Sequence, residues 1–168
     1  ATVLLEDGTR YYFELDETTG KYTNDLTVKY KLEYDTDHFV LKSQDKTIVF
    51  NTKGKVSSII DHHGNITSYT YNGLQLNTIT LPDGKTMAFE YSGGVISKVT
   101  MEDGSYVSYS YDADKNLISF TDQTGVTIHY EYNTTHDMTS WYYVADKKIV
   151  QNTYNDSHQL TTQIDGTG

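Results

Sequence analysis

The sequence predicts an all-β protein of tandem antiparallel β-hairpin repeats that form a long, curling sheet. Three observations predict this class. Glycine-centred turns recur about every 20 residues, two aromatic residues follow each turn at fixed offsets, and polar and apolar residues alternate between turns. Such alternation is typical of strands with one buried and one solvated face. Sheets of more than about ten strands coil, because each strand is twisted.

The composition agrees with thin sheets and tight turns. The chain has 168 residues, among them 16 Tyr and one Pro. Tyr buries an apolar ring while its hydroxyl stays hydrated, which suits a sheet with one solvated face. The net charge of −10 excludes nucleic acid as an expected partner, because its phosphates are also negative. Cys is absent, and no apolar run is long enough for a membrane span.

Glycines mark one end of each expected hairpin. Gly64, Gly84, Gly104 and Gly125 lie 20, 20 and 21 residues apart. Glycine adopts the positive φ of a tight turn without strain. Five and seven residues after each glycine stand two aromatics: Tyr69 and Tyr71, Phe89 and Tyr91, Tyr109 and Tyr111, Tyr130 and Tyr132. We expect the first members of these pairs to be buried together as a cross-strand ladder.

A second turn closes the other end of each hairpin. An aromatic residue precedes Asp or Asn, and an apolar residue follows the aromatic by six positions: Phe50 and Val56, Tyr111 and Leu117, Tyr132 and Met138, Tyr154 and Leu160. Another apolar residue, such as Phe120, follows three positions later. Leu117 and Phe120 would face opposite sides of a regular strand. Either a β-bulge intervenes, or Leu117 still belongs to the turn.

The segment from Tyr111-Asp112 to Gly125, followed by Tyr130-Glu131-Tyr132-Asn133, resembles the YD repeat of Rhs proteins. The similarity is firm over about residues 46–166 and loose before them. We therefore expect degenerate hairpin repeats over 1–45 and one continuous domain of regular repeats, each of about 20–22 residues, over 46–168. The resemblance implies a segment of an Rhs-like spiral shell.

The resemblance also implies a function. It indicates a non-catalytic structural segment of a secreted or cell-wall-associated bacterial protein, not an enzyme. The repeats would build a shell or stalk that encloses or presents a C-terminal toxin in intercellular competition. The implied partners are the rest of the shell and the toxin domain. The alternative is an adhesion module that binds a surface glycan or a protein.

The two ends of the chain suggest a further partner. Ala1 and Gly168 both fall within the repeat pattern, which predicts that the chain is cut from a longer protein. Unpaired strand edges near residues 1–10 and 155–168 would then favour self-association.

The candidate ligand-stacking surface is the aromatic run Trp141, Tyr142 and Tyr143, because aromatic rings stack on sugars. Aromatic residues that recur in every hairpin are more typical of a core, so this assignment depends on exposure. No catalytic, cofactor-binding or metal-binding residues are expected.

Three other groups contain residue types that could carry chemistry. His62 and His63 occupy a turn and are expected to be solvated there rather than to hold a metal. His129 and Glu131 share the polar face, with Glu90 expected two strands away, and form the one group with acid–base potential. Turn carboxylates are expected to line one rim of the sheet, where solvation is favoured over calcium binding: Asp61, Asp83, Glu102, Asp103 and Asp122.

Overall fold

The computed structural model describes residues 1–24, 29–143 and 147–166, where all regular structure is β-strand. This confirms the predicted all-β class. Within these ranges no helix could cross a membrane. The chain divides into two units, Ala1–Thr86 and Met87–Gly168, and each is described by itself.

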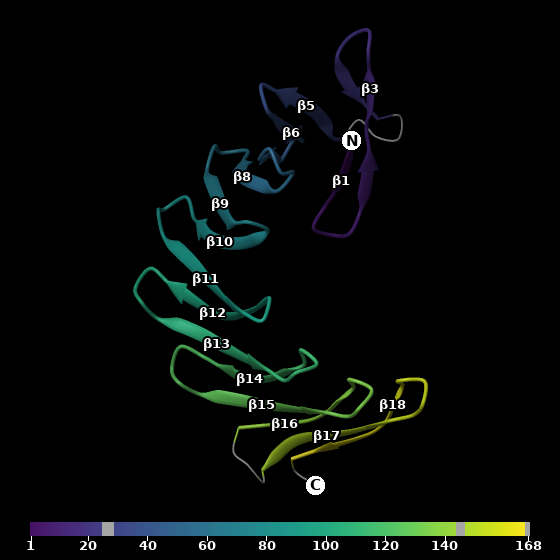
Figure 1. Cartoon of the computed structure of the whole chain (residues 1–168), viewed down its shortest axis with the longest axis vertical. Coiled ribbons are helices and arrows are strands. Elements are labelled where there is room, and N and C mark those ends of the chain that lie inside the picture. The colour runs from purple at the N-terminus through teal and green to yellow at the C-terminus, as the bar shows by residue number, and fades with distance from the viewer. Residues whose placement is uncertain (25–28, 144–146, 167–168) are drawn as a thin grey trace. The chain divides into compact units, whose positions relative to one another are not determined.

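The first unit consists of consecutive antiparallel hairpins (Figure 1). β1–β2 and β3–β4 are separate two-stranded sheets, whereas β5 to β10 are hydrogen-bonded in chain order. β6 and β7 lie on either side of the expected domain boundary at residue 45 and pair with each other. This pairing does not test the boundary, which stays a prediction. The strands are β1 (Thr2–Leu4), β2 (Arg10–Tyr12), β3 (Glu14–Asp16), β4 (Lys21–Thr23), β5 (Lys31–Asp35), β6 (His38–Lys42), β7 (Lys46–Phe50), β8 (Val56–Asp61), β9 (Ile66–Asn72) and β10 (Gln75–Thr80).

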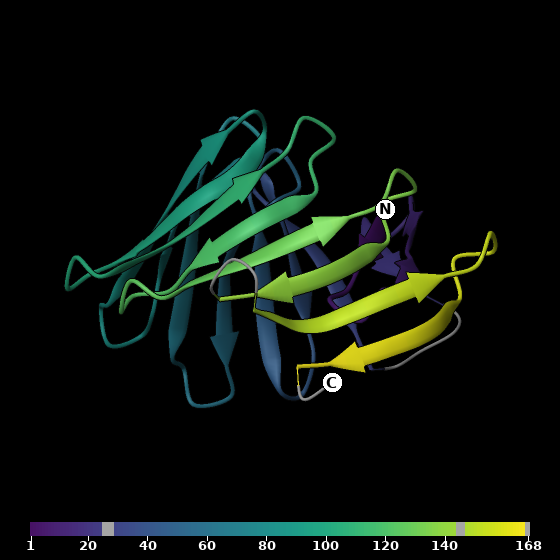
Figure 2. The same ribbon diagram turned by 90° about the horizontal axis from the view of Figure 1, so that it is seen from below.

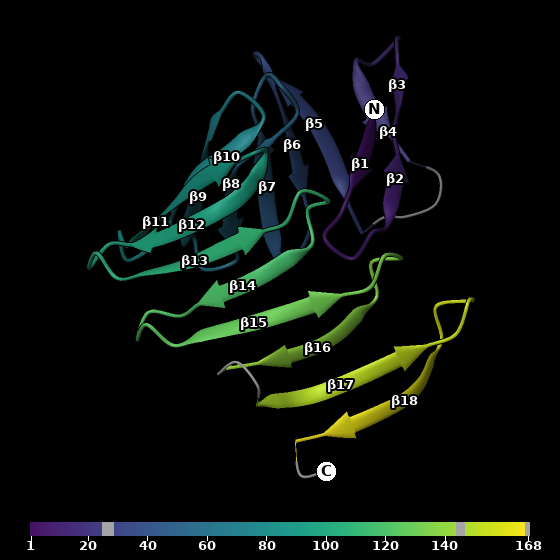
Figure 3. The same ribbon diagram turned by 60° about the horizontal axis from the view of Figure 1, so that its bottom comes forward.

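The second unit is a run of antiparallel strands that lie side by side in chain order (Figure 3). Seen from below, these strands are visibly twisted (Figure 2). The strands are β11 (Thr86–Ser92), β12 (Val95–Met101), β13 (Tyr106–Tyr111), β14 (Leu117–Thr121), β15 (Thr127–Tyr132), β16 (Met138–Tyr142), β17 (Lys148–Tyr154) and β18 (Leu160–Asp165). The predicted tandem hairpins are therefore confirmed.

The glycine turns form where the sequence predicts them. Gly104 and Gly125 have φ of 82° and 87°, and the amide of each donates to a carbonyl three residues earlier. At the opposite end of the β13–β14, β15–β16 and β17–β18 hairpins, residues other than glycine adopt the same left-handed conformation: Lys115, His136 and His158. Asp112 supports its loop by accepting two backbone N–H groups on Oδ1, at 3.0 and 2.8 Å. Such side-chain acceptors replace backbone partners that a tight turn leaves unpaired.

A β-bulge occurs in each regular hairpin. Tyr111 pairs with Leu117 and Ser110 pairs with Ser119, so Ile118 is the extra residue. The bulge brings Leu117 and Phe120 to the same face, which settles the alternatives left open by the sequence. Equivalent extra residues are Ser57, Asn77, Ser97, Thr139 and Thr161.

The expectation that the first aromatics of the repeats are buried together as a cross-strand ladder is wrong. Tyr69, Phe89, Tyr109 and Tyr130 are each only half-buried. They are also not direct neighbours, because residues of the return strands intervene; Tyr109, for example, pairs with Phe120. In the second unit, the described strands follow one another in one sheet, and the ring of Tyr109 contacts that of Phe120 on the neighbouring strand.

The closed apolar core lies in the first unit. Val3 and Phe13, from the N-terminal hairpins, are buried against Leu32, Leu41 and Ile48 of β5 to β7. Residues 1–10 therefore do not form the expected edge of the long run of strands. Their apolar side chains gain more by covering a sheet face than by extending the sheet.

Candidate functional site

The three residues of the expected stacking surface do not share one face. Trp141 and Tyr143 contact each other with ring centroids 5.7 Å apart and planes at 83°. Tyr142 lies on the opposite face, stacked on His129 at 5.2 Å, because successive strand residues alternate. Tyr143 is 47% exposed, whereas Trp141 is half-buried. A ligand could therefore stack on Trp141 and Tyr143 but not on all three rings at once.

Glu131 is held in an ion pair on the polar face. Its Oε2 accepts hydrogen bonds from Lys148 Nζ at 2.5 Å and from the Ser140 hydroxyl at 2.6 Å. These two donors, Lys148 foremost, hold the pKa of Glu131 below its usual range. A carboxylate stabilised in its charged form is a poor general base. The cluster therefore serves to join β15, β16 and β17.

The expected proximity of Glu90 to this cluster is wrong. Glu90 lies on β11, four strands from the β15 residues His129 and Glu131, rather than two. It pairs instead with Lys98 on the adjacent strand, with the charged atoms 3.2 Å apart. The geometry thus does not assemble the acid–base group considered from the sequence.

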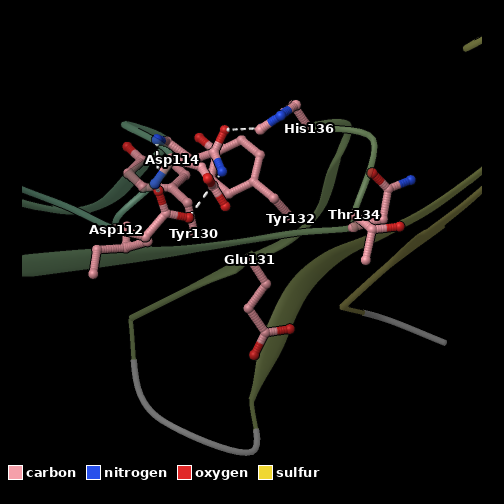
Figure 4. A pocket seen from close by; sticks show the side chains of 10 residues that line it. Asp112, Asp114, Tyr130, Glu131, Tyr132, Thr134 and His136 are labelled. Carbon is pink, nitrogen blue, oxygen red and sulfur yellow. Dashed lines mark hydrogen bonds between the residues drawn. The ribbon is translucent and has the colours of Figure 1, made fainter.

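A shallow cavity of about 400 Å³ lies beside the loops after β13 and β15 (Figure 4). Asp112, Tyr130, Tyr132 and His136 contribute to its lining. Glu131 points away from these side chains, to the other side of the strand (Figure 4). The cavity is a groove between two hairpin loops.

Two histidines connect these loops to their neighbours. His136 Nδ1 lies 2.9 Å from Asn116 Oδ1, and His158 Nδ1 lies 2.9 Å from Asp137 Oδ1. Hydrogen bonds from the side chains of Asn133, foremost, and of His158 lower the pKa of Asp137. Our sequence analysis missed both histidines. The available signal was that each stands four residues after a repeated tyrosine.

The other histidines and carboxylates singled out in the sequence lie in turns. His62 and His63 are exposed, with ring centroids 3.7 Å apart, while Asp61 Oδ1 accepts the amide of His63 at 2.8 Å. Among the residues that the structure describes, no three His, Asp or Glu side chains gather as metal ligands.

The rim carboxylates of the second unit also accept hydrogen bonds within their own turns. Asp103 Oδ1 accepts the amide of Ser105 at 2.9 Å, and Asp122 Oδ1 accepts those of Thr124 and Val126 at 2.8 and 3.0 Å. Hydrogen bonds, mainly to the side chains of Ser105 and Thr124, lower the pKa of these two carboxyl groups. They stabilise the turns that contain them.

The fold and these surfaces define a hairpin-repeat protein of the all-β class. No known family model matches the chain. Over 81 residues it is 36% identical to the tRNA nuclease WapA of Bacillus subtilis (strain 168). The same identity relates it to the tRNA3(Ser)-specific nuclease WapA of Bacillus spizizenii and to the tRNA(Glu)-specific nuclease WapA of Bacillus subtilis subsp. natto. The match covers 42% of this chain and 4% of each relative. The chain thus corresponds to a small part of these proteins.

Proposed function

We propose that this chain is a non-catalytic structural segment of a secreted or cell-wall-associated YD-repeat protein. In this proposal it forms part of a β-sheet shell or stalk that encloses or presents a C-terminal toxin in intercellular competition. The observation that carries the proposal is the use of the repeated side chains. They close their own hairpin or join it to the next one.

The contacts of the repeated tyrosines illustrate this use. The Tyr71 hydroxyl donates to the Val56 carbonyl at 2.9 Å, and the Tyr154 hydroxyl donates to the Met138 carbonyl at 3.0 Å. Each bond links one hairpin to the preceding one. Repeat proteins gain stability from such interfaces between neighbouring units.

The partial relationship to WapA proteins supports the same role. These relatives are named as tRNA nucleases, and the matched segment covers only 4% of their length. We propose that in such proteins an RNA-cleaving toxin lies outside the matched repeats. The partners of this chain are then the rest of the repeat shell and that toxin domain, and this segment does not itself bind nucleic acid.

Two measurements test the proposal. The purified chain, incubated with total tRNA, is expected to cleave none, and cleavage that co-purifies with the chain would refute a non-catalytic role. In the full-length parent protein, Tyr109→Ala is expected to reduce killing in a competition assay, since the half-buried ring stabilises the sheet, while toxin activity in lysates is retained. Tyr106→Ala, at an exposed position of the same strand, is the matched control.

A second function is favoured by the exposure of Tyr143 beside Trp141. We propose as the alternative an adhesion module that binds a surface glycan, or a protein, through these two rings. A glycan array with the chain and with Tyr143→Ala tests it, and Tyr106→Ala again serves as the control. Tight binding that is lost only in Tyr143→Ala would replace the structural role with the adhesive one.

A further inference from the structure

Asn72 is the last residue of β9 and stands directly before Gly73. It pairs with Gln75 across the short loop of Gly73 and Leu74, where Gly73 has a φ of 61°. The Asn72 side chain is exposed, and it makes no hydrogen bond with any residue that the structure describes. Within the same part of the chain, no atom beyond its chain neighbours lies within 4 Å of the position that a Cβ of Gly73 would take. This end of the hairpin is therefore open around both residues.

The pair Asn72-Gly73 favours an attack of the backbone on the side chain. The Gly73 nitrogen bonds to the side-chain carbonyl carbon of Asn72, which closes a succinimide ring. The side-chain nitrogen leaves as ammonia with the proton that Gly73 loses. Glycine has no side chain to hinder this attack. The peptide between the two residues must first rotate out of the strand, and element ends fray more readily than interiors.

Other asparagines lack these conditions. Asn72 alone among the asparagines of the sequence precedes glycine. Asn133 Oδ1 accepts the amides of Thr135 and Asp137 at 3.0 and 2.9 Å. Asn155 Oδ1 likewise accepts two amides of its own loop, each at 3.0 Å. These bonds immobilise both carboxamides, and the residue that follows each of them carries a side chain.

Aspartates that precede glycine are protected in another way. Asp83 and Asp103 each stand directly before a glycine. Hydrogen bonds, foremost from the side chains of Lys85 and Ser105, lower the pKa of these two carboxyl groups. An ionised carboxylate is a poor target for the backbone nitrogen, because ring closure would have to expel a charged oxygen. Asn72 thus differs from both groups in its free, neutral side chain.

We propose that Asn72 is a site of spontaneous covalent modification, at which water converts the asparagine to isoaspartate through a succinimide. Water adds to either carbonyl of the ring and breaks its bond to the Gly73 nitrogen, which yields aspartate or isoaspartate without any oxidant or reductant. In isoaspartate the backbone runs through Cβ, so one carbon is added between residues 72 and 73. The pairing of residues 72 and 75 then loses its alignment, and the β9–β10 hairpin opens at this end.

The test incubates the full chain at neutral pH in water labelled with heavy oxygen. Each ring opening adds one heavy oxygen atom to residue 72, and mass spectrometry of peptides measures it. Label at residue 72 is expected to exceed label at Asn133 and Asn155 by about 10-fold or more, because each of those side chains must first break two hydrogen bonds. Asn72→Ser, which copies the Ser92-Gly93 sequence of the next hairpin, is the matched control and is expected to gain no label at this position.

Hydrogen exchange tests the consequence for the hairpin. Chains that carry isoaspartate, separated by chromatography, are expected to lose protection of the amides of residues 72 and 75. Asn72→Asp adds the charge without the extra carbon and is expected to keep that protection. Label at residue 72 no greater than at Asn133 and Asn155 would overturn the proposal. Label in a synthetic peptide of residues 69–77 but not in the folded chain would overturn it too, and equal protection in the isoaspartate chain and Asn72→Asp would refute the opening of the hairpin.

Discussion

Tyr109 and Phe120 face each other across β13 and β14, with ring centroids 5.5 Å apart and planes at 39°. They meet because the bulge at Ile118 shifts the register of the return strand by one residue. Paired rings of this kind cover part of one another within a sheet. The stability of the second unit therefore depends on cross-strand pairs.

Removal of one ring tests this dependence. Tyr109→Ala is expected to lower the free energy of unfolding by about 2 kcal/mol, less than the roughly 3–5 kcal/mol of a fully buried ring. Urea unfolding measures the change. Tyr106→Ala, on the exposed face of β13, is expected to cost under about 1 kcal/mol, since it loses only the contact of Lys98 with the ring. Equal losses in both variants would show that the two faces of the strand are not distinct.

Replacement and deletion of Ile118 both test its assignment as the bulged residue. Ile118→Ser is expected to change stability by less than about 1 kcal/mol, because Ile118 is exposed and unpaired in the register. Deletion of Ile118 is expected to remove the bulge and keep the hairpin folded, because Leu117 and Phe120 are then two positions apart and still share one face. Hydrogen exchange of the β13 and β14 amides checks both variants. Lost protection of these amides after the deletion would contradict the assignment of the bulge.

The two turn types predict opposite effects of glycine. Gly125→Ala is expected to destabilise the chain by about 1–2 kcal/mol, because φ is 87° there and the added Cβ is strained. Lys115→Gly is expected to stabilise it by about 1 kcal/mol, because Lys115 already has φ of 67°. Thermal unfolding of both variants measures the difference. A loss of stability in Lys115→Gly would mean that its side chain contributes contacts that outweigh the strain.

The pH dependence of the first unit is expected to depend on Glu33. Hydrogen bonds from Lys31 foremost, and from Lys42, lower the pKa of Glu33 from 4.5 to about 2. A lowered folded-state pKa adds stability above the unfolded-state value and loses it as pH falls through the folded-state value. The stability difference between the chain and Glu33→Gln should therefore be full above about pH 5 and vanish between about pH 4.5 and 2. Urea unfolding across this range, with Glu14→Gln as the control, measures it. A difference that does not vary with pH would contradict the ion pair.

The sequence was sufficient for the hairpins because their determinants are local. Gly125 predicts a turn, and Tyr130 indicates which face of the following strand is apolar. Neither prediction depends on residues far away in the sequence. The bulge was one of two explanations that the spacing of Leu117 and Phe120 allowed. The burial of Tyr109 was overestimated, since alternation shows which side a residue faces but not what covers that side.

The candidate sites were harder to predict because they depend on which segments become neighbours. Tyr142 was grouped with Trp141 although adjacent strand residues face opposite ways. The link from His158 to Asp137 spans 21 residues and forms only because their loops lie side by side. A search for residues at a fixed offset from the repeated tyrosines would have found it.

The uniform links between hairpins constrain how a gene for such a protein can change in length. Gain or loss of a whole unit of 20 or 21 residues leaves the bulges, tyrosines and loop contacts of the other units in register. One unit adds two strands, about 10 Å of sheet. A single-residue insertion within a strand instead turns the following side chains to the opposite face. Unequal recombination between copies is thus tolerated in whole steps, and descendants of one gene should differ in sheet length by multiples of about 10 Å.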